Sequence, residues 1–136
     1  MSRENVEVVR RASEAFFAGD VEAALELLDP HIEWHGTVGG FDEGSVFRGR
    51  DAVVAQFTQY LEEWERIEMT AERFIDAGAD DVVVFFHEVA KGRESGIVVE
   101  TDTGAINTVR DGRIVRVRPF MDRAAALRAA GLPEEA

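Results

Sequence analysis

Hydrophobic residues in the first part of the chain recur with the three-to-four-residue spacing of an amphipathic helix. Within residues 2–18, Val9 and Phe16 share one face with other apolar positions, which predicts a first helix. Asp20 suits the N-cap of a second, short helix, and we expect Pro30 to end that helix.

The next segment combines a short strand, a loop and a third helix. The stretch HIEWH at residues 31–35 alternates apolar and polar positions, which predicts a strand that leads into a glycine-rich loop. A third helix is expected from Asp51 to about Glu65, because Phe57, Leu61 and Trp64 give it a wide aromatic face.

The hydrophobic period then changes from helical spacing to alternation. This pattern predicts four long antiparallel strands, at residues 67–77, 82–90, 96–109 and 113–121. The Asp111-Gly112 pair is a hairpin-turn signal between the last two strands. Asp122 is expected to cap a final short helix that Gly131 closes.

This order of elements predicts an α+β fold in a single domain covering residues 1–136, because helices come first and an antiparallel sheet follows. A long curved sheet with helices along one face can enclose a conical cavity. Its opposite face must then contact water or pair with another subunit.

The composition narrows the possible partners. A formal net charge of −12 repels phosphate backbones, so neither nucleic acid nor an anionic membrane is an expected partner. No apolar run approaches the roughly 20 residues of a membrane span. The chain has no cysteine, and its N-terminal stretch lacks the apolar block of a secretory signal, so the expected location is cytoplasmic.

Neither a metal nor a cofactor is expected. His31 and His35 share a face of the predicted strand, but they lie about 13 Å apart there, which is too far for one ion. The sequence contains no P-loop, dinucleotide fingerprint or nucleophile elbow.

Three segments that fall in register carry a resemblance to a known family: AFFAGDVEAALELLDPHIEWH, FRGRDAVVAQF and TVRDGRIVRVRPFMDRAAALRAAGL. With the order of elements, they resemble the SnoaL-like branch of the NTF2-like superfamily. The resemblance implies a cone in which three N-terminal helices pack on a strongly curved antiparallel sheet, with a short C-terminal helix. It also implies an internal ligand pocket and a homodimer, which we expect to form through the outer face of the sheet.

The superfamily includes ketosteroid isomerases, polyketide cyclases and dehydratases, so the chemistry has to be argued from individual residues. His35 corresponds to the aspartate base of the isomerases, and an imidazole with a pKa of roughly 6.5 suits proton abstraction. The donors that stabilise their enolate correspond here to Ala12 and Ala105, so steroid isomerisation is not expected. Alternatively, His35 has no catalytic role, and its side chain forms a hydrogen bond with the backbone close to the loop.

Glu88 is a second candidate catalytic residue. Register against the ketosteroid isomerases implies that Val84, Phe86 and Glu88 face inward, where burial would raise the pKa of the carboxyl group of Glu88 and suit it to acid or base chemistry. A slip by one residue would turn His87 inward instead. The alternative for Glu88 is a hydrogen-bonded strand residue or a dimer contact.

Asp122 is the third candidate, because members of the family commonly carry an acid at this point. As an N-cap, Asp122 would contribute about 1 kcal/mol to stability without any catalytic role. Arg116 and Arg118 share the other face of the last strand, where we expect them to pair with acids at a dimer interface.

The candidate ligand-binding residues are apolar, aromatic or amide side chains that the predicted elements could turn into the cone: Trp34, Phe57, Tyr60, Trp64, Phe86, Asn107 and Met121. Aromatic residues at helical spacing are also common in an ordinary core. Tyr60 needs a hydrogen-bond partner for its hydroxyl if it is buried. Asn107 lies in mid-strand and either contacts a ligand or faces a wet or subunit-contacting surface.

The leading hypothesis is a protein that binds a small, largely apolar organic molecule in an internal cavity. If it catalyses a reaction, we expect cofactor-free proton transfer of the isomerase, cyclase or dehydratase type. The alternative is a binding or dimerisation module of the same fold without catalysis.

Overall fold

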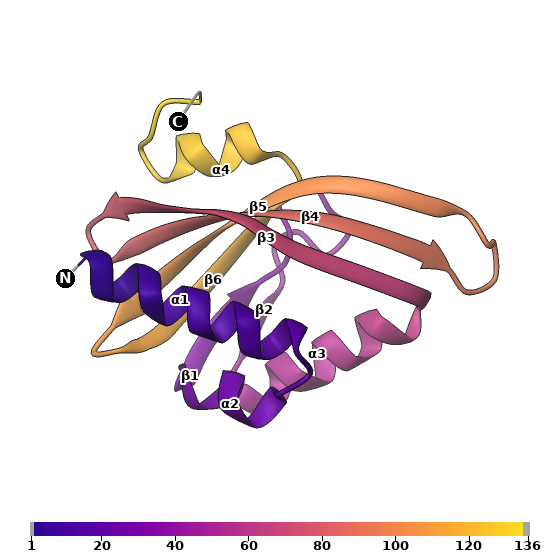
Figure 1. Cartoon of the computed structure of the whole chain (residues 1–136), viewed down its shortest axis with the longest axis horizontal. Helices are drawn as coiled ribbons and strands as arrows, with labels where there is room; N and C mark the ends of the chain where they lie inside the picture. The colour runs from indigo at the N-terminus through magenta and orange to yellow at the C-terminus, as the bar shows by residue number, and fades with distance from the viewer. Residues whose placement is uncertain (1, 135–136) are drawn as a thin grey trace.

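A mixed six-stranded sheet, with helices on both faces, makes up the body of the computed structural model, which describes residues 2–134 (Figure 1). The helices are α1 (Ser2–Phe17), α2 (Val21–Glu26), α3 (Arg50–Glu62) and α4 (Arg123–Ala129). The strands are β1 (Leu28–His35), β2 (Val46–Arg48), β3 (Trp64–Gly78), β4 (Asp81–Gly92), β5 (Val98–Arg110) and β6 (Arg113–Phe120). The three N-terminal helices lie on one face of the sheet and α4 lies on the other, so the predicted α+β fold is confirmed.

The strand order is β2-β1-β6-β5-β4-β3. The pairs from β6 to β3 are antiparallel, as expected, but β1 pairs with β6 in parallel. The four predicted antiparallel strands are therefore confirmed, and β1, for which no partner was predicted, joins their sheet in parallel. A parallel pair needs a long connection, and here most of the chain lies between the two strands.

The second helix is shorter than predicted. It ends at Glu26, and β1 begins at Leu28, so Pro30 lies inside a strand and does not terminate the helix. The β1–β6 register shifts between Leu28 and Glu33. Because the ladder is interrupted there, the missing N–H of Pro30 leaves no strand hydrogen bond unmade.

Two further boundaries differ from the prediction. The third helix ends at Glu62, and Trp64, expected on that helix, opens the long strand β3. The three-residue strand β2 was not predicted, because such a short segment has no measurable period. It pairs with the end of β1, with Phe47 opposite Trp34.

The predicted helix caps and the predicted hairpin turn are present in the structure. Asp20 accepts a hydrogen bond from the backbone N–H of Ala23, and Asp122 accepts one from Ala124. Asp111 and Gly112 have φ values of 51° and 77°, which is the conformation that a type I′ hairpin turn requires.

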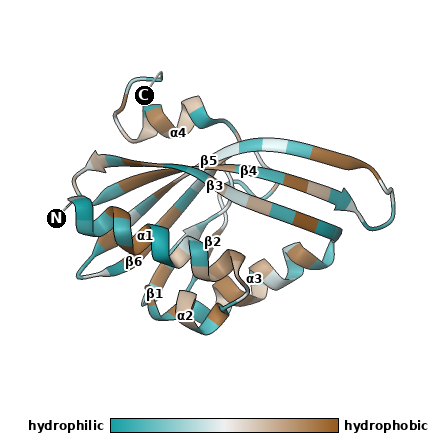
Figure 2. Ribbon diagram, viewed as in Figure 1, coloured by the Kyte–Doolittle hydropathy of each residue, from teal (hydrophilic) through white to brown (hydrophobic). Residues whose placement is uncertain are grey.

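Hydrophobic residues pack on both faces of the sheet because side chains alternate along each strand (Figure 2). Val84 of β4 belongs to the core under the N-terminal helices, whereas Val83, Phe85 and Leu127 form the core under α4. Arg123 ties α4 to the sheet by donating to the backbone oxygens of Phe86 and Thr103 at 2.8 and 3.2 Å. No helix in residues 2–134 is both long and apolar enough to cross a membrane.

Candidate functional site

A cavity of about 570 Å³ lies between the sheet and the helices α1 and α3. Its volume falls within the range of roughly 300–1,000 Å³ that is typical of small-molecule sites. β5 lines it with every second residue from Val99 to Asn107, and β4 contributes Phe86, Glu88 and Ala90. This spacing shows that one continuous face of the curved sheet forms the wall of the cavity.

The cavity has a closed end and an open rim. At the closed end Leu28, Val117 and Asn107 are 1%, 3% and 7% exposed. At the rim Phe41 is 94% exposed and Met121 is 44% exposed. The cavity is therefore open to solvent beside Phe41 and Met121, and it is closed off among the buried side chains of Leu28 and Val117.

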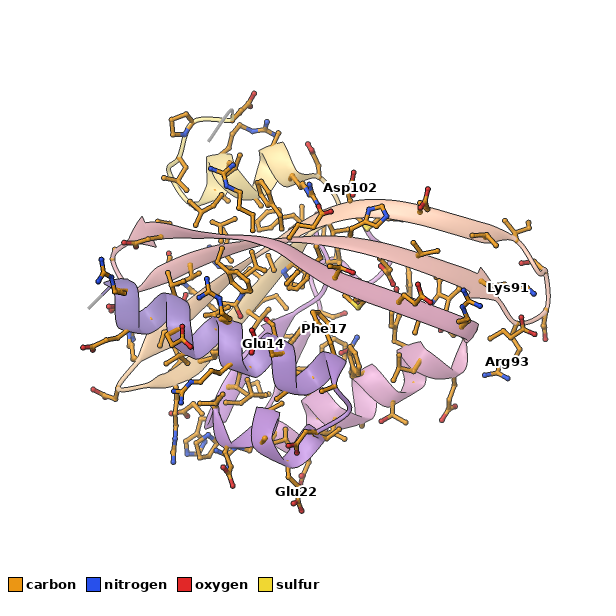
Figure 3. All side chains as sticks on the ribbon, in the orientation of Figure 1. Glu14, Phe17, Glu22, Lys91, Arg93 and Asp102 are labelled. Carbon is orange, nitrogen blue, oxygen red and sulfur yellow. The ribbon has the colours of Figure 1, made fainter. Side chains whose placement is uncertain are left out.

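Aromatic side chains dominate the helical side of the wall. Phe16 packs on Phe57 with ring centroids 5.2 Å apart, and Phe17 meets Phe86 edge-on at 5.9 Å. Figure 3 shows Phe17 on the side of the sheet that carries the N-terminal helices. Each residue named from the sequence as a ligand-binding candidate lines this cavity: Trp34, Phe57, Tyr60, Trp64, Phe86, Asn107 and Met121.

Glu88 and Tyr60 form a polar pair inside this apolar wall. The Tyr60 hydroxyl donates a hydrogen bond of 2.5 Å to Oε1 of Glu88. Burial raises the pKa of Tyr60 above its ordinary value of 10.0, and the hydrogen bond to Glu88 and the negative charge of that carboxylate add to the effect. Tyr60 is therefore a neutral donor, and Glu88 is the acceptor.

His87 faces away from the cavity, on the face that carries α4. Its Nδ1 lies 2.6 Å from Oδ1 of Asp102, which Figure 3 shows on that face, and its Nε2 lies 3.4 Å from Glu100. The hydrogen bond to Asp102 is the main cause that raises the pKa of His87. The alternative register, with His87 inward, does not occur.

Two polar side chains in the wall have unfilled hydrogen-bonding capacity within the described part of the chain. Asn107, although 7% exposed, makes no side-chain hydrogen bond there. Nε1 of Trp64 is buried without a hydrogen bond of full geometry, but it approaches the Tyr60 hydroxyl closely enough to oppose the rise in the pKa of Tyr60. Asn107 is therefore the group that is available to a ligand or to water in the cavity.

His35 does not line the cavity. Trp34 takes the inward position at the end of β1, so the next residue points to the outer face, where Nε2 of His35 lies 3.4 Å from Oε1 of Glu33. Asp122 is also absent from the wall; it is exposed and caps α4. Of the three candidate catalytic residues, the structure brings only Glu88 into the cavity.

Sequence reasoning missed the contribution of the glycine-rich loop between β1 and β2 to the rim. Thr37, Phe41 and Asp42 of this loop line the cavity, and the backbone N–H of Thr37 donates to Oδ1 of Asp42 at 3.1 Å. At Gly36 a Cβ would lie 1.9 Å from the backbone oxygen of Asp42. The glycines of the loop were the available signal, since they permit this close approach.

Comparison with solved structures gives the same fold. An NTF2-like protein from Burkholderia thailandensis E264 is 25% identical, with a TM-score of 0.78 over 95% of this chain and 98% of that one. A proposed SnoaL-like polyketide cyclase from Jannaschia sp. CCS1 is 21% identical, with a TM-score of 0.76 over 97% and 94%. TerC, co-crystallised with polyporic acid, is 22% identical, with a TM-score of 0.75 over 94% and 98%.

No curated protein sequence matches the chain. The model of the SnoaL-like domain matches residues 9–117, which run from the middle of α1 into β6. The chain therefore belongs to the SnoaL-like family of the NTF2-like superfamily.

Proposed function

We propose that this protein binds a small, largely apolar organic molecule in the cavity between the sheet and the helices α1 and α3. The observation that carries the proposal is the cavity of about 570 Å³, with an aromatic wall and a few convergent polar groups. Glu88, Tyr60 and Asn107 supply those groups. Such a combination of apolar surface and few polar anchors is typical of small-molecule sites.

The structural relatives support a binding role. TerC, which shares the fold, was co-crystallised with polyporic acid, a small organic molecule. In this chain the apolar lining of the cavity would favour binding by about 25 cal/mol per Å² of apolar surface that a ligand buries.

The position of Glu88 favours a second candidate function, cofactor-free proton transfer of the isomerase, cyclase or dehydratase type. Its carboxylate lies in the cavity wall, and Tyr60 occupies one of its oxygens. The remaining oxygen is the acceptor to which a substrate would lose a proton. His35 and Asp122 are outside this scheme because neither contacts the cavity.

We further propose a homodimer through the outer face of the sheet. Nε of Arg116 and Nε of Arg118 are buried there without a hydrogen-bond partner among residues 2–134. A second copy could supply acceptors, because the chain carries 27 acidic residues against 15 basic ones. Sedimentation equilibrium tests this: Arg116→Glu combined with Arg118→Glu should yield monomers, and a monomeric parent protein would contradict the proposal.

Binding is tested by titrating 2-naphthaleneethanol, a neutral apolar probe, into the protein and following heat release and thermal unfolding. Saturable binding with one site per chain is expected. Ala105→Leu, which fills the closed end of the cavity, should abolish it, since Ala105 is only 4% exposed and lines the wall.

Two control variants accompany this test. Ala55→Leu adds the same side chain on the exposed side of α3, away from the cavity, and should bind the probe normally. His35→Ala should also bind it normally. Absence of saturable binding, or equal binding by Ala105→Leu, would contradict the proposed function.

A further inference from the structure

We propose that the cavity selects an organic ligand that carries a cationic group, such as a protonated amine, placed against Glu88. This inference rests on the proposed binding function and specifies the chemical class of the ligand.

The charged residues that line the cavity are all acidic. They are Asp42, Glu63 and Glu88, and the lining residues within the described range include no lysine, arginine or histidine. A ligand carboxylate or phosphate would therefore enter without a counter-ion, in a wall that already carries negative charge. Transfer of an unpaired charge into such a partly buried site is strongly unfavourable.

The carboxylate of Glu88 has the capacity to receive a cation. Tyr60 donates to Oε1 of Glu88, and no described residue donates to the second oxygen. No basic residue neutralises the charge from within the cavity. A ligand ammonium group would supply both the missing hydrogen bond and the missing positive charge.

Aromatic rings surround this carboxylate. Phe86 lies two residues from Glu88 on the same face of β4, and Tyr60 reaches Glu88 from α3. Trp64 packs edge-on against Tyr60, with ring centroids 6.2 Å apart. Carboxylates combined with aromatic faces are the arrangement that proteins use to bind organic cations, because the ring faces attract positive charge.

The closed end of the cavity, at Asn107, suits an uncharged part of the ligand. Glu88 is the register partner of Thr101, and Asn107 lies six residues further along β5, so the two groups are about 20 Å apart along the sheet. Asn107 is buried, unpaired and uncharged. We therefore place the cationic group of the ligand near Glu88 and its apolar body between Glu88 and Asn107. In a ligand long enough to reach Asn107, a neutral hydrogen-bonding group would contact that amide.

Three probes with the same naphthalene body test this inference: 2-(2-naphthyl)ethylamine, 2-naphthaleneethanol and 2-naphthylacetate. Their dissociation constants are measured by calorimetry at neutral pH. The amine should bind at least about tenfold more tightly than the carboxylate, which corresponds to about 1.4 kcal/mol, and the alcohol should lie between them.

Glu88→Gln tests the assigned counter-ion. The glutamine keeps an oxygen that can accept from Tyr60, so the variant should fold. The ratio between the dissociation constants of the alcohol and the amine should fall towards one, whatever the absolute affinity for the alcohol. Glu62→Gln is the matched control, because Glu62 is exposed and outside this cavity. It removes the same charge from a protein whose net charge is −12, and it should keep the preference.

The outcomes separate this inference from the proposed function. If all three probes bind equally, or the carboxylate binds most tightly, the cation preference is overturned while the binding function stands. A preference that survives in Glu88→Gln overturns the role of Glu88. If none of the probes binds, the proposed function itself fails. The order amine, alcohol, carboxylate in the parent protein supports the inference even if Glu88→Gln does not fold.

Discussion

His87 of β4 and Asp102 of β5 are register partners on the outer face of the sheet, and Nδ1 of His87 lies 2.6 Å from Oδ1 of Asp102. Glu100 approaches the other ring nitrogen at 3.4 Å, and Arg123 approaches Asp102 at 3.5 Å. The hydrogen bond raises the pKa of His87 and lowers the pKa of Asp102. The pair therefore favours a charged histidine and a charged aspartate in the folded protein.

This pair predicts a pH-dependent contribution to stability. The raised pKa of His87 adds stability that is complete below its ordinary value of 6.5 and is lost as the pH rises through the raised value. The lowered pKa of Asp102 adds stability above its ordinary value of 3.8 that is lost on acidification. His87→Asn should therefore lower the free energy of unfolding most between pH 3.8 and pH 6.5, and less at alkaline pH.

Urea unfolding of the parent protein and of His87→Asn at several pH values measures this difference. His31→Asn, which alters an exposed histidine, is the control and should change stability little. A difference that does not vary with pH would contradict the charge pairing of His87 and Asp102.

Tyr60 should titrate at unusually high pH. It is the single tyrosine of the chain, so the near-ultraviolet absorbance of phenolate reports on it alone. Because burial and the Glu88 hydrogen bond raise its pKa above 10.0, folded protein should remain in the phenol form at pH values where the urea-unfolded chain has ionised. Glu88→Gln should lower the apparent pKa, and coinciding titration curves for folded and unfolded protein would refute the described pair.

Replacing Asn107 should separate stability from binding. Asn107→Leu replaces an amide that faces the cavity with an apolar side chain of similar size, so the free energy of unfolding should change by less than about 1 kcal/mol. The same change should weaken the binding of probes that place a hydrogen-bonding group at the closed end of the cavity. Chemical denaturation and calorimetry measure the two effects, and a destabilised variant would show that Asn107 has a structural partner.

Asp122 should behave as a helix cap without an effect on ligand binding. Asp122→Ala removes the acceptor for the N–H of Ala124 and should cost about 1 kcal/mol of stability. Asp122→Asn keeps a capping oxygen and should cost only part of that. Neither variant should change the affinity for 2-naphthaleneethanol, and a large loss of affinity in both would place Asp122 in the site.

Features that depend on local chemistry could be predicted from the sequence. The turn at Asp111 and Gly112 and the cap at Asp122 each depend on a few adjacent residues, and both occur as expected. The inward orientation of Glu88 agrees with the register implied by the resemblance to the ketosteroid isomerases. The uninterrupted apolar run that begins at Val82 is buried on both faces of β4, so it could not by itself exclude a slip of one residue.

Features that depend on distant segments could not be predicted in this way. The parallel pairing of β1 with β6 joins Trp34 to Val117, and no local pattern encodes it. His35 was assigned to the cavity by counting residues from neighbouring motifs, whereas its orientation depends on the register of β1, which Pro30 and the register shift obscure. An error of one residue reverses the face of a strand residue.

The pairing of β1 with β6 also affects how the chain can fold during its synthesis. β1 ends at His35, and its partner begins only at Arg113, so one edge of β1 remains open until β6 has left the ribosome. Pairings between such distant segments close late and make folding slow. Nascent chains of this protein therefore expose an unpaired strand edge until β6 has been synthesised, which is the interval in which chaperones would bind them.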